Sequence, residues 1–319
     1  MIPVTAAGCI RGLGFVMLAL MIARRSEKHT ICALACLAMA FSISCAHRTV
    51  PLPRGVTVMH QTIALTGTKV PVDVYLPEGV RQAPVVVIAH GFSRSRINMA
   101  GWGSLMASNG FIAAVPDLPA WADHQRNGLA LSELLDRINR GDIVQEPRPS
   151  GVAGSMGFSA GGLSSVLAAS SNRCVQCWVG LDPVDLGGLG ADAAKRLNFP
   201  CVVLQAEPGA WNAQGNSARV VDALPGPVLA LRVKGAVHVD AENPTDWLAE
   251  LVCGKSDPSR RKVFELYAVA ALRAVFFGEL SSLETLGTAE TNAAVKDVRS
   301  RQVQAFLGAS GHPQSLNPR

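Results

Sequence analysis

From about residue 55 onward, short apolar runs alternate with segments of helical pattern, and this alternation constrains the fold more than any other feature. The run Val85–Ala89 follows Pro84 and is apolar throughout, as expected for a strand buried on both faces. Further strands are predicted at residues 56–65, 69–76, 111–115, 151–156, 177–181, 201–205 and 228–233. Helices are predicted at residues 97–109, 121–140, 163–171 and 260–277. The pattern therefore predicts an α/β domain, a mainly parallel sheet with helices on both faces.

Composition and charge narrow the classes of protein further. Hydrophobic residues make up 49% of the 319 residues and charged residues only 17%, which excludes a mainly disordered chain. The net charge is +5, of which residues 1–45 carry +3. The remaining +2 is too small for the basic surface of a nucleic-acid-binding protein, so no nucleic-acid partner is expected.

The N-terminal segment has the pattern of an export signal. Two apolar runs, Leu13–Ala23 and Ile31–Ala46, flank the polar segment Arg24–His29, and neither reaches the ~20 residues that span a bilayer. Read from Met21 as the true start, a short basic stretch precedes an apolar one and small residues follow. We therefore expect residues 1–46 to be a signal or anchor and residues 47–319 to form a single domain with a loose C-terminal tail.

Three fates of this segment stay open. Ser42-Ile43-Ser44-Cys45 resembles a degraded lipoprotein cleavage site, which would leave a lipidated Cys45 attached to the membrane. Ser44-Cys45-Ala46 has the small-x-small form of ordinary signal cleavage. An uncleaved anchor is the third alternative. The expected locations are accordingly periplasmic, membrane-anchored or secreted.

The cysteines after the leader are even in number. Cys174, Cys177, Cys201 and Cys253 suit an oxidising compartment, and we expect two disulfides, or one disulfide and two core thiols. The Cys174-x-x-Cys177 spacing lacks the second Cys pair or His pair of a zinc site, so no metal is expected.

One motif carries the candidate nucleophile. Gly157-Phe158-Ser159-Ala160-Gly161 matches G-x-S-x-G, follows an apolar strand and precedes a helix, as a nucleophile elbow requires. A side chain at Gly157 or Gly161 would collide with the neighbouring strand or helix. Ser159 would then present its hydroxyl, and the Ala160 amide would point at the reacting carbonyl oxygen.

A serine hydroxyl needs a base within hydrogen-bond reach, and in such sites the acid and then the histidine follow the serine in the chain. Only His238 and His312 lie beyond Ser159. His312 stands in the C-terminal tail. His238 instead follows the predicted strand 228–233, and the general base in such sites lies in the loop after the last strand. We therefore predict His238 as the general base.

The acid has two main candidates. Asp182 ends the strand at 177–181, and Glu207 ends the strand at 201–205, so either carboxylate could orient His238. Asp185 is a weaker candidate. The residues alone leave Asp182 and Glu207 open.

The loop after the strand Val85–Ala89 completes the predicted site. It reads His90-Gly91-Phe92, and such a loop supplies the second amide of an oxyanion hole, here that of Phe92 together with that of Ala160. His90 precedes the nucleophile in sequence and is expected to shape the loop rather than to act as the base.

With these motifs, residues 55–280 resemble the α/β-hydrolase superfamily, and more narrowly the group of chlorophyllases, platelet-activating-factor acetylhydrolases and dienelactone-hydrolase-like bacterial esterases. Further markers are Ala107–Phe111, Pro116-Asp117 and Leu181–Asp185. The resemblance implies the α/β-hydrolase fold and favours Asp182 as the acid. Phe158 and Ala160 stand where chlorophyllase-like sequences carry His and Arg, which argues against chlorophyll as the substrate.

The sequence thus predicts an exported serine hydrolase that cleaves a small carboxylic ester without a cofactor. An amidase, a thioesterase or a cutinase-like polyester hydrolase would use the same residues, and a catalytically inactive binding protein is the alternative from another class. Trp102, Trp121 and Trp211 are candidates for lining an acyl pocket, against the simpler interpretation that each is an ordinary core or surface residue.

Overall fold

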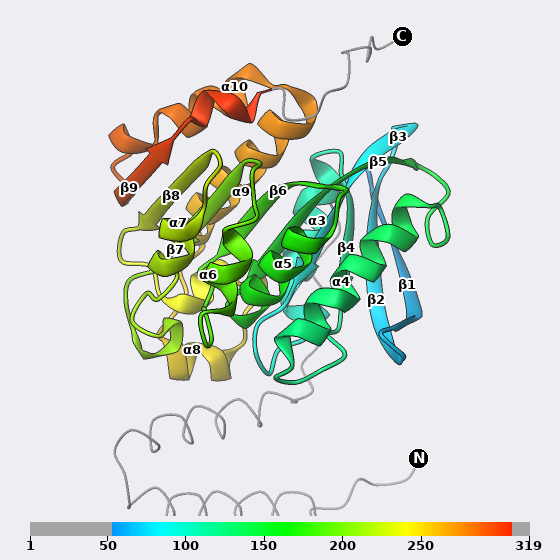
Figure 1. The fold of residues 1–319 in the computed structure, drawn as a ribbon, viewed down its shortest axis with the longest axis horizontal. Helices are drawn as coiled ribbons and strands as arrows, with labels where there is room; N and C mark the ends of the chain where they lie inside the picture. Colours follow the sequence, from blue (N-terminus) through cyan, green and yellow to red (C-terminus); the bar gives the residue numbers. More distant parts are fainter. Residues whose placement is uncertain (1–52, 308–319) are drawn as a thin grey trace, which may run out of the picture. The chain divides into compact units, whose positions relative to one another are not determined.

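A computed structural model describes residues 53–307 of the chain. One nine-stranded sheet runs through this part in the order β1-β2-β4-β3-β5-β6-β7-β8-β9 (Figure 1). The strands from β4 to β8 in this order are parallel. The chain is therefore an α/β protein, as the alternation of strand and helix patterns predicts.

The parallel strands coincide with the apolar runs of the sequence. They are β3 (Gln82–Ala89), β4 (Ile112–Pro116), β5 (Arg148–Phe158), β6 (Val175–Leu181), β7 (Cys201–Gln205) and β8 (Val228–Val233). All five residues of β4 and of β7 are buried, because helices cover both sides of these strands.

Antiparallel strands close the sheet at both ends. The hairpin of β1 (Val56–Leu65) and β2 (Thr68–Pro77) turns at Thr66-Gly67, and β2 pairs antiparallel with β4. At the opposite edge, β9 (Val295–Arg301) pairs antiparallel with β8. Sequence reasoning missed β9 because this strand is polar and mostly exposed.

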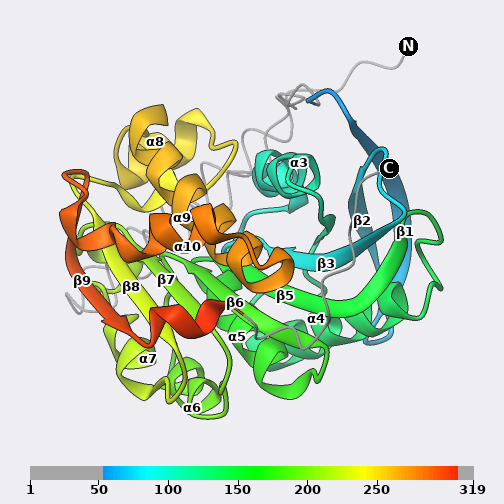
Figure 2. The ribbon, with the colours of Figure 1, turned by 90° about the horizontal axis from the view of Figure 1, so that it is seen from above.

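Helices form a layer on each face of the sheet (Figure 2). One layer contains α4 (His124–Asn139), α5 (Ala160–Ser171), α6 (Leu189–Ala194) and α7 (Ala218–Ala223). The other contains α3 (Ala100–Ser108), α8 (Trp247–Cys253), α9 (Pro258–Phe277) and α10 (Leu280–Gly287). Each layer encloses its own apolar cluster against the sheet. The short helices α6, α7 and α8 and helix α10 were not predicted.

The expected disulfides are not found among residues 53–307, where all four cysteines are free. Cys177 on β6 and Cys201 on β7 lie on neighbouring strands, but Cys201 is in register with Trp178. Side chains alternate between the faces of a sheet, so the two sulfurs enter the apolar clusters on opposite faces. Burial raises the pKa of both thiols.

Several expectations concern parts outside the described residues. These are the start at Met21, the signal or anchor at 1–46, lipidation of Cys45 and the tail with His312. Within residues 53–307, no helix is both long enough and apolar enough to cross a membrane.

Candidate active site

The candidate nucleophile stands at the turn between β5 and α5. Ser159 is the N-cap of α5 and has a φ of 55° and a ψ of −124°, a strained backbone conformation for a residue with a side chain. Its N–H donates to the carbonyl of Leu181 on β6, over 3.1 Å. The turn thus holds the serine at the carboxyl end of the parallel strands.

Two glycines make this tight turn feasible. A Cβ atom on Gly157 would lie 2.2 Å from the carbonyl oxygen of Gly161, and one on Gly161 would lie 2.2 Å from that of His90. Both contacts are with backbone, which cannot rotate away. The collision that the motif predicts therefore exists at both positions.

A hydrogen-bonded series connects Ser159 to a histidine and a carboxylate. The Ser159 Oγ lies 2.9 Å from Nε2 of His238, and Nδ1 of the same ring lies 2.6 Å from Oδ2 of Asp182. All three residues are buried. A carboxylate accepts hydrogen bonds, so Nδ1 carries the proton and Nε2 is free to accept one from the serine hydroxyl.

Asp182 accepts hydrogen bonds from other groups besides His238. It is fully buried and its φ is 42°. The Ala206 N–H donates to its Oδ1 over 3.0 Å, and the Asn212 Nδ2 donates to its Oδ2 over 3.1 Å. Together with His238, which contacts Oδ2, these donors pair both oxygens of the carboxylate, as a buried charge requires.

Asn212 was not identified from the sequence. This buried residue also donates to the carbonyl of Glu207, and its Oδ1 accepts the N–H groups of Gly209 and Gly215. It therefore connects the loop after β7 to the candidate acid. The sequence holds no signal for it, because an asparagine in a loop is common and its contact with Asp182 spans 30 residues.

The structure does not bring the other two carboxylate candidates to His238. Glu207 forms an ion pair with Lys296 on β9, over 2.8 Å, and accepts the Gly235 N–H. Asp185 accepts the N–H groups of Gly190 and Ala191 in the first turn of α6. Both carboxylates thus have other partners.

The loop after β3 lies beside the serine. His90 Nε2 accepts the Leu118 N–H over 3.0 Å, so its Nδ1 carries the proton and donates to the Gly91 carbonyl. Burial lowers the pKa of His90, which favours this neutral form. His90 therefore bonds to loop backbone rather than to Ser159.

A cavity of about 260 Å³ adjoins this loop, and the two residues predicted to supply oxyanion-hole amides, Phe92 and Ala160, both line it. The N–H of Ala160 is the first of helix α5, where N–H groups have no partner within the helix. Neither Ser159 nor His238 is among the described residues that line this cavity. The cavity thus lies on the side of the candidate oxyanion hole.

Of the three tryptophans, Trp121 lines this cavity. Its ring packs against Phe92 in a tilted arrangement, with centroids 4.5 Å apart, and its Nε1 donates to the Ser93 hydroxyl. Trp102 is fully buried in the core and donates to the Ala241 carbonyl. Trp211 is not among the described residues that line the cavity.

Two ion pairs fix the loop that carries His238, which forms the short helix η4 (His238–Ala241). The buried Asp240 pairs with Arg260 on α9, over 2.6 Å. Four residues beyond His238, the buried Glu242 pairs with Arg94, which also contacts Asp246 over 2.8 Å. Sequence reasoning identified neither pair, because each joins segments that are distant in the chain.

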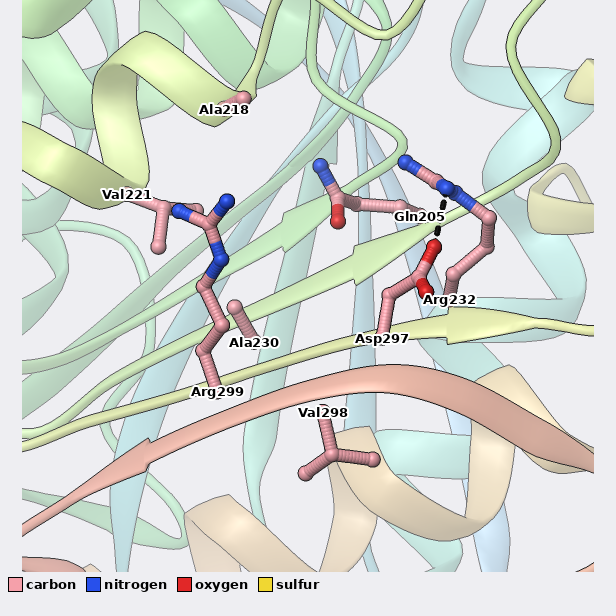
Figure 3. Close-up of a pocket in the computed structure, with 8 residues that line it drawn as sticks. All are labelled: Gln205, Ala218, Val221, Ala230, Arg232, Asp297, Val298 and Arg299. Carbon is pink, nitrogen blue, oxygen red and sulfur yellow. Dashed lines mark hydrogen bonds and ion pairs between the residues drawn. The ribbon is translucent and has the colours of Figure 1, made fainter. Parts of the chain in front are cut away.

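A second and larger cavity, of about 390 Å³, lies between α7 and strands β7, β8 and β9 (Figure 3). Arg232 and Asp297 form an ion pair at its wall, and Arg299 pairs with Asp222 of α7. None of the predicted catalytic residues lines it. Within residues 53–307, no group of three or more His, Cys, Asp or Glu side chains is arranged to hold a metal ion.

No family model matches the chain, and no curated protein matches it either. A buried serine, histidine and aspartate in a hydrogen-bonded series can transfer an acyl group, since the ring can remove the serine proton while the carboxylate stabilises the resulting charge.

Proposed function

We propose that the chain is a serine hydrolase of the α/β-hydrolase fold, which cleaves carboxylic esters through an acyl-enzyme on Ser159. The observation that carries the proposal is the series of two hydrogen bonds from the Ser159 hydroxyl through His238 to Asp182. The fold assignment is supported by the order along the chain: the serine follows β5, the acid follows β6 and the histidine follows β8.

The first half of the reaction forms the acyl-enzyme. As the Ser159 Oγ attacks the ester carbonyl carbon, His238 Nε2 takes the hydroxyl proton, and Asp182 stabilises the imidazolium that results. The amides of Phe92 and Ala160 donate to the oxyanion of the tetrahedral intermediate. His238 then returns the proton to the departing alcohol, which leaves the acyl group on Ser159.

The second half releases the acid. Water replaces the alcohol beside His238. Nε2 of His238 takes a proton from this water as the water oxygen attacks the acyl carbon. Collapse of the second tetrahedral intermediate returns the proton to Ser159 and frees the carboxylic acid. This cycle uses the side chains and backbone amides of the site together with water, and the proposal includes no cofactor.

Export is part of the proposal and rests on the N-terminal sequence alone. The basic stretch and apolar run from Met21 support a periplasmic, secreted or lipid-anchored protein. Mass spectrometry of the mature N-terminus tests this, since a diacylglyceryl group on Cys45 and cleavage near Ala46 give different masses.

The function is tested with p-nitrophenyl esters from acetate to octanoate and the purified full-length chain. We expect hydrolysis by the wild type and a loss of at least about 10³-fold in kcat in Ser159→Ala, because the nucleophile is gone. Thermal melts of both proteins check that the variant is folded. Equal rates for the two folded proteins would contradict the proposal.

A further inference from the structure

The cavity beside the candidate oxyanion hole contains a polar side chain without a partner. His124, at the first position of α4, lines the cavity and is only 8% exposed. Its Nδ1 is buried and has no hydrogen-bond partner among the described residues. A buried polar atom left unpaired is costly, and because His124 lines the cavity, a bound ligand group that pairs with its ring would remove this cost.

Most other polar side chains of the wall already have partners, and the Ser93 hydroxyl accepts from Trp121 Nε1. The Asn127 amide exchanges two hydrogen bonds with the backbone of Ala120. Asp117 accepts from Arg96, and Arg94 is bound by Glu242 and Asp246. Of the described residues that line the wall, His124 is the one with a buried polar atom left unpaired, and this atom makes it the candidate for selecting a polar substrate group.

The position of the cavity indicates which part of an ester it receives. In the proposed reaction, the leaving alcohol must lie against Nε2 of His238 to be protonated. Phe92 lines the cavity together with Ala160 and Gly161, which follow Ser159 in the chain, whereas neither Ser159 nor His238 is among the described residues that line it. The cavity thus lies on the oxyanion side of Ser159, away from the leaving group, where the acyl chain extends.

Size and charge limit the acyl chain. At about 260 Å³ the cavity is smaller than the ~300–1,000 Å³ of sites for drug-sized ligands, so it suits a chain of a few carbons. Around it, the guanidinium groups of Arg94 and Arg96 contact four carboxylates, those of Asp73, Asp117, Glu242 and Asp246. The excess of negative charge disfavours an anionic acyl group.

The protonation state of His124 indicates which kind of polar group on the substrate it can bind. Burial lowers the pKa of this histidine, which favours the neutral ring at neutral pH. A neutral imidazole has one donor nitrogen and one acceptor nitrogen. A hydroxyl can pair with either nitrogen because it both donates and accepts, whereas a carbonyl can pair only with the donor.

We infer that this cavity is the acyl pocket and that it selects short, uncharged hydroxyacyl groups through a hydrogen bond to His124. The inference rests on the proposed esterase function and specifies its substrate class. His124 is a specificity residue in this account, while Ser159 and His238 perform the chemistry. The exposed Trp121, which packs against Phe92 and donates a hydrogen bond to Ser93, forms the outer wall of the pocket.

The test compares p-nitrophenyl 3-hydroxybutyrate with p-nitrophenyl 3-methylbutyrate, which has a methyl group in place of the hydroxyl. We expect the wild-type chain to favour the hydroxy ester about fivefold to tenfold in kcat/KM, the effect of one neutral hydrogen bond. The octanoate and hemisuccinate esters should be poorer substrates because of size and charge, respectively.

Two variants at His124 and one control connect the preference to this residue. His124→Phe keeps a ring but no polar atom and should bring the ratio of the two esters close to one. His124→Gln restores a hydrogen-bonding group and should regain part of the preference. Arg299→Ala, at the wall of the second cavity, should keep the wild-type ratio. Thermal melts check the folding of each variant.

The outcomes separate this inference from the proposed function. Hydrolysis of both esters without a preference for the hydroxy ester overturns the inference and leaves the esterase intact. A preference that persists in the folded His124→Phe variant also overturns it. If the wild type hydrolyses no ester and a phosphonate does not label Ser159, the proposed function fails, and the inference with it.

Discussion

Arg94 and Glu242 form a bidentate ion pair that joins the loop after β3 to the loop that carries His238. The Nε–Oε1 distance is 2.6 Å and the Nη2–Oε2 distance is 2.8 Å. Both side chains are buried. Because Arg94 follows Phe92 by two residues and Glu242 follows His238 by four, the pair sets the candidate oxyanion hole relative to the base.

Breaking this pair should therefore cost both stability and activity. In Glu242→Gln the buried Arg94 loses its main partner, and we expect the free energy of unfolding to fall by about 3 kcal/mol. Urea unfolding measures this change. The matched control is Asp142→Asn in the exposed Arg140–Asp142 pair, which should cost less than about 1 kcal/mol. Equal losses in the two variants would contradict the account of a structural pair.

The identity of the acid is tested by two isosteric substitutions. Asp182→Asn should lower kcat by about 10⁴-fold, because an amide can no longer fix the tautomer of His238 or stabilise its charge. Glu207→Gln should change kcat by less than about threefold, since its partners are Lys296 and Gly235. Ester hydrolysis by the two variants gives the answer. The reverse order of effects would transfer the role of the acid to Glu207.

Asn212 should act as a positioning residue for Asp182. Removing its side chain in Asn212→Ala takes a donor from a buried carboxylate, and we expect kcat to fall about tenfold with little change in KM. The control is Asn216→Ala, which loses hydrogen bonds to the backbone of Asp185 but none to Asp182. A fall in kcat as large in the control would mean that loop stability, and not Asp182, is the cause.

A pH effect on stability is expected at the end of helix α9. Hydrogen bonds from Arg273 and Ser282 lower the pKa of Glu279 to about 2, from an ordinary 4.5. A lowered carboxyl pKa stabilises the folded state above pH 4.5, and this stabilisation is lost as the pH falls toward 2. Glu279→Gln should therefore unfold more easily at pH 7, by about 1 kcal/mol after screening, and the gap should shrink in acid.

Chemical unfolding of both proteins at pH 7, 4 and 3 measures this gap. Glu284→Gln, exposed on the neighbouring helix α10, is the control and should show no such trend. A gap between Glu279→Gln and the wild type that widens on acidification would contradict the assignment.

The parallel core could be predicted from the sequence because each central strand is buried on both faces and is therefore an unbroken apolar run. The β7 and β8 bounds match the prediction, residues 201–205 and 228–233. The edge strand β9 carries charges in its exposed positions and gives no such signal. Helices α6 and α7 have six residues each, too few to establish a helical periodicity.

The candidate site likewise has residues that could be predicted from the sequence and residues that could not. The serine and histidine follow strands in recognisable contexts, so their meeting could be anticipated. The choice between Asp182 and Glu207 depends on how the loops after β6 and β7 turn, and the residues alone do not fix that direction. Local sequence patterns do not encode register and long-range packing. These determine the contacts of Asn212, the Arg94–Glu242 pair and the absence of disulfides among residues 53–307.

The central claim is that Ser159 is a nucleophile activated by His238. A fluorophosphonate probe tests it most directly, because its stable phosphonyl-serine product needs no knowledge of the natural substrate. We expect the native full-length chain to be labelled at Ser159, as mapped by peptide mass spectrometry, and labelling to be lost in Ser159→Ala and strongly slowed in His238→Ala. A folded wild-type chain that the probe leaves unlabelled, or labels at another residue, would contradict the account.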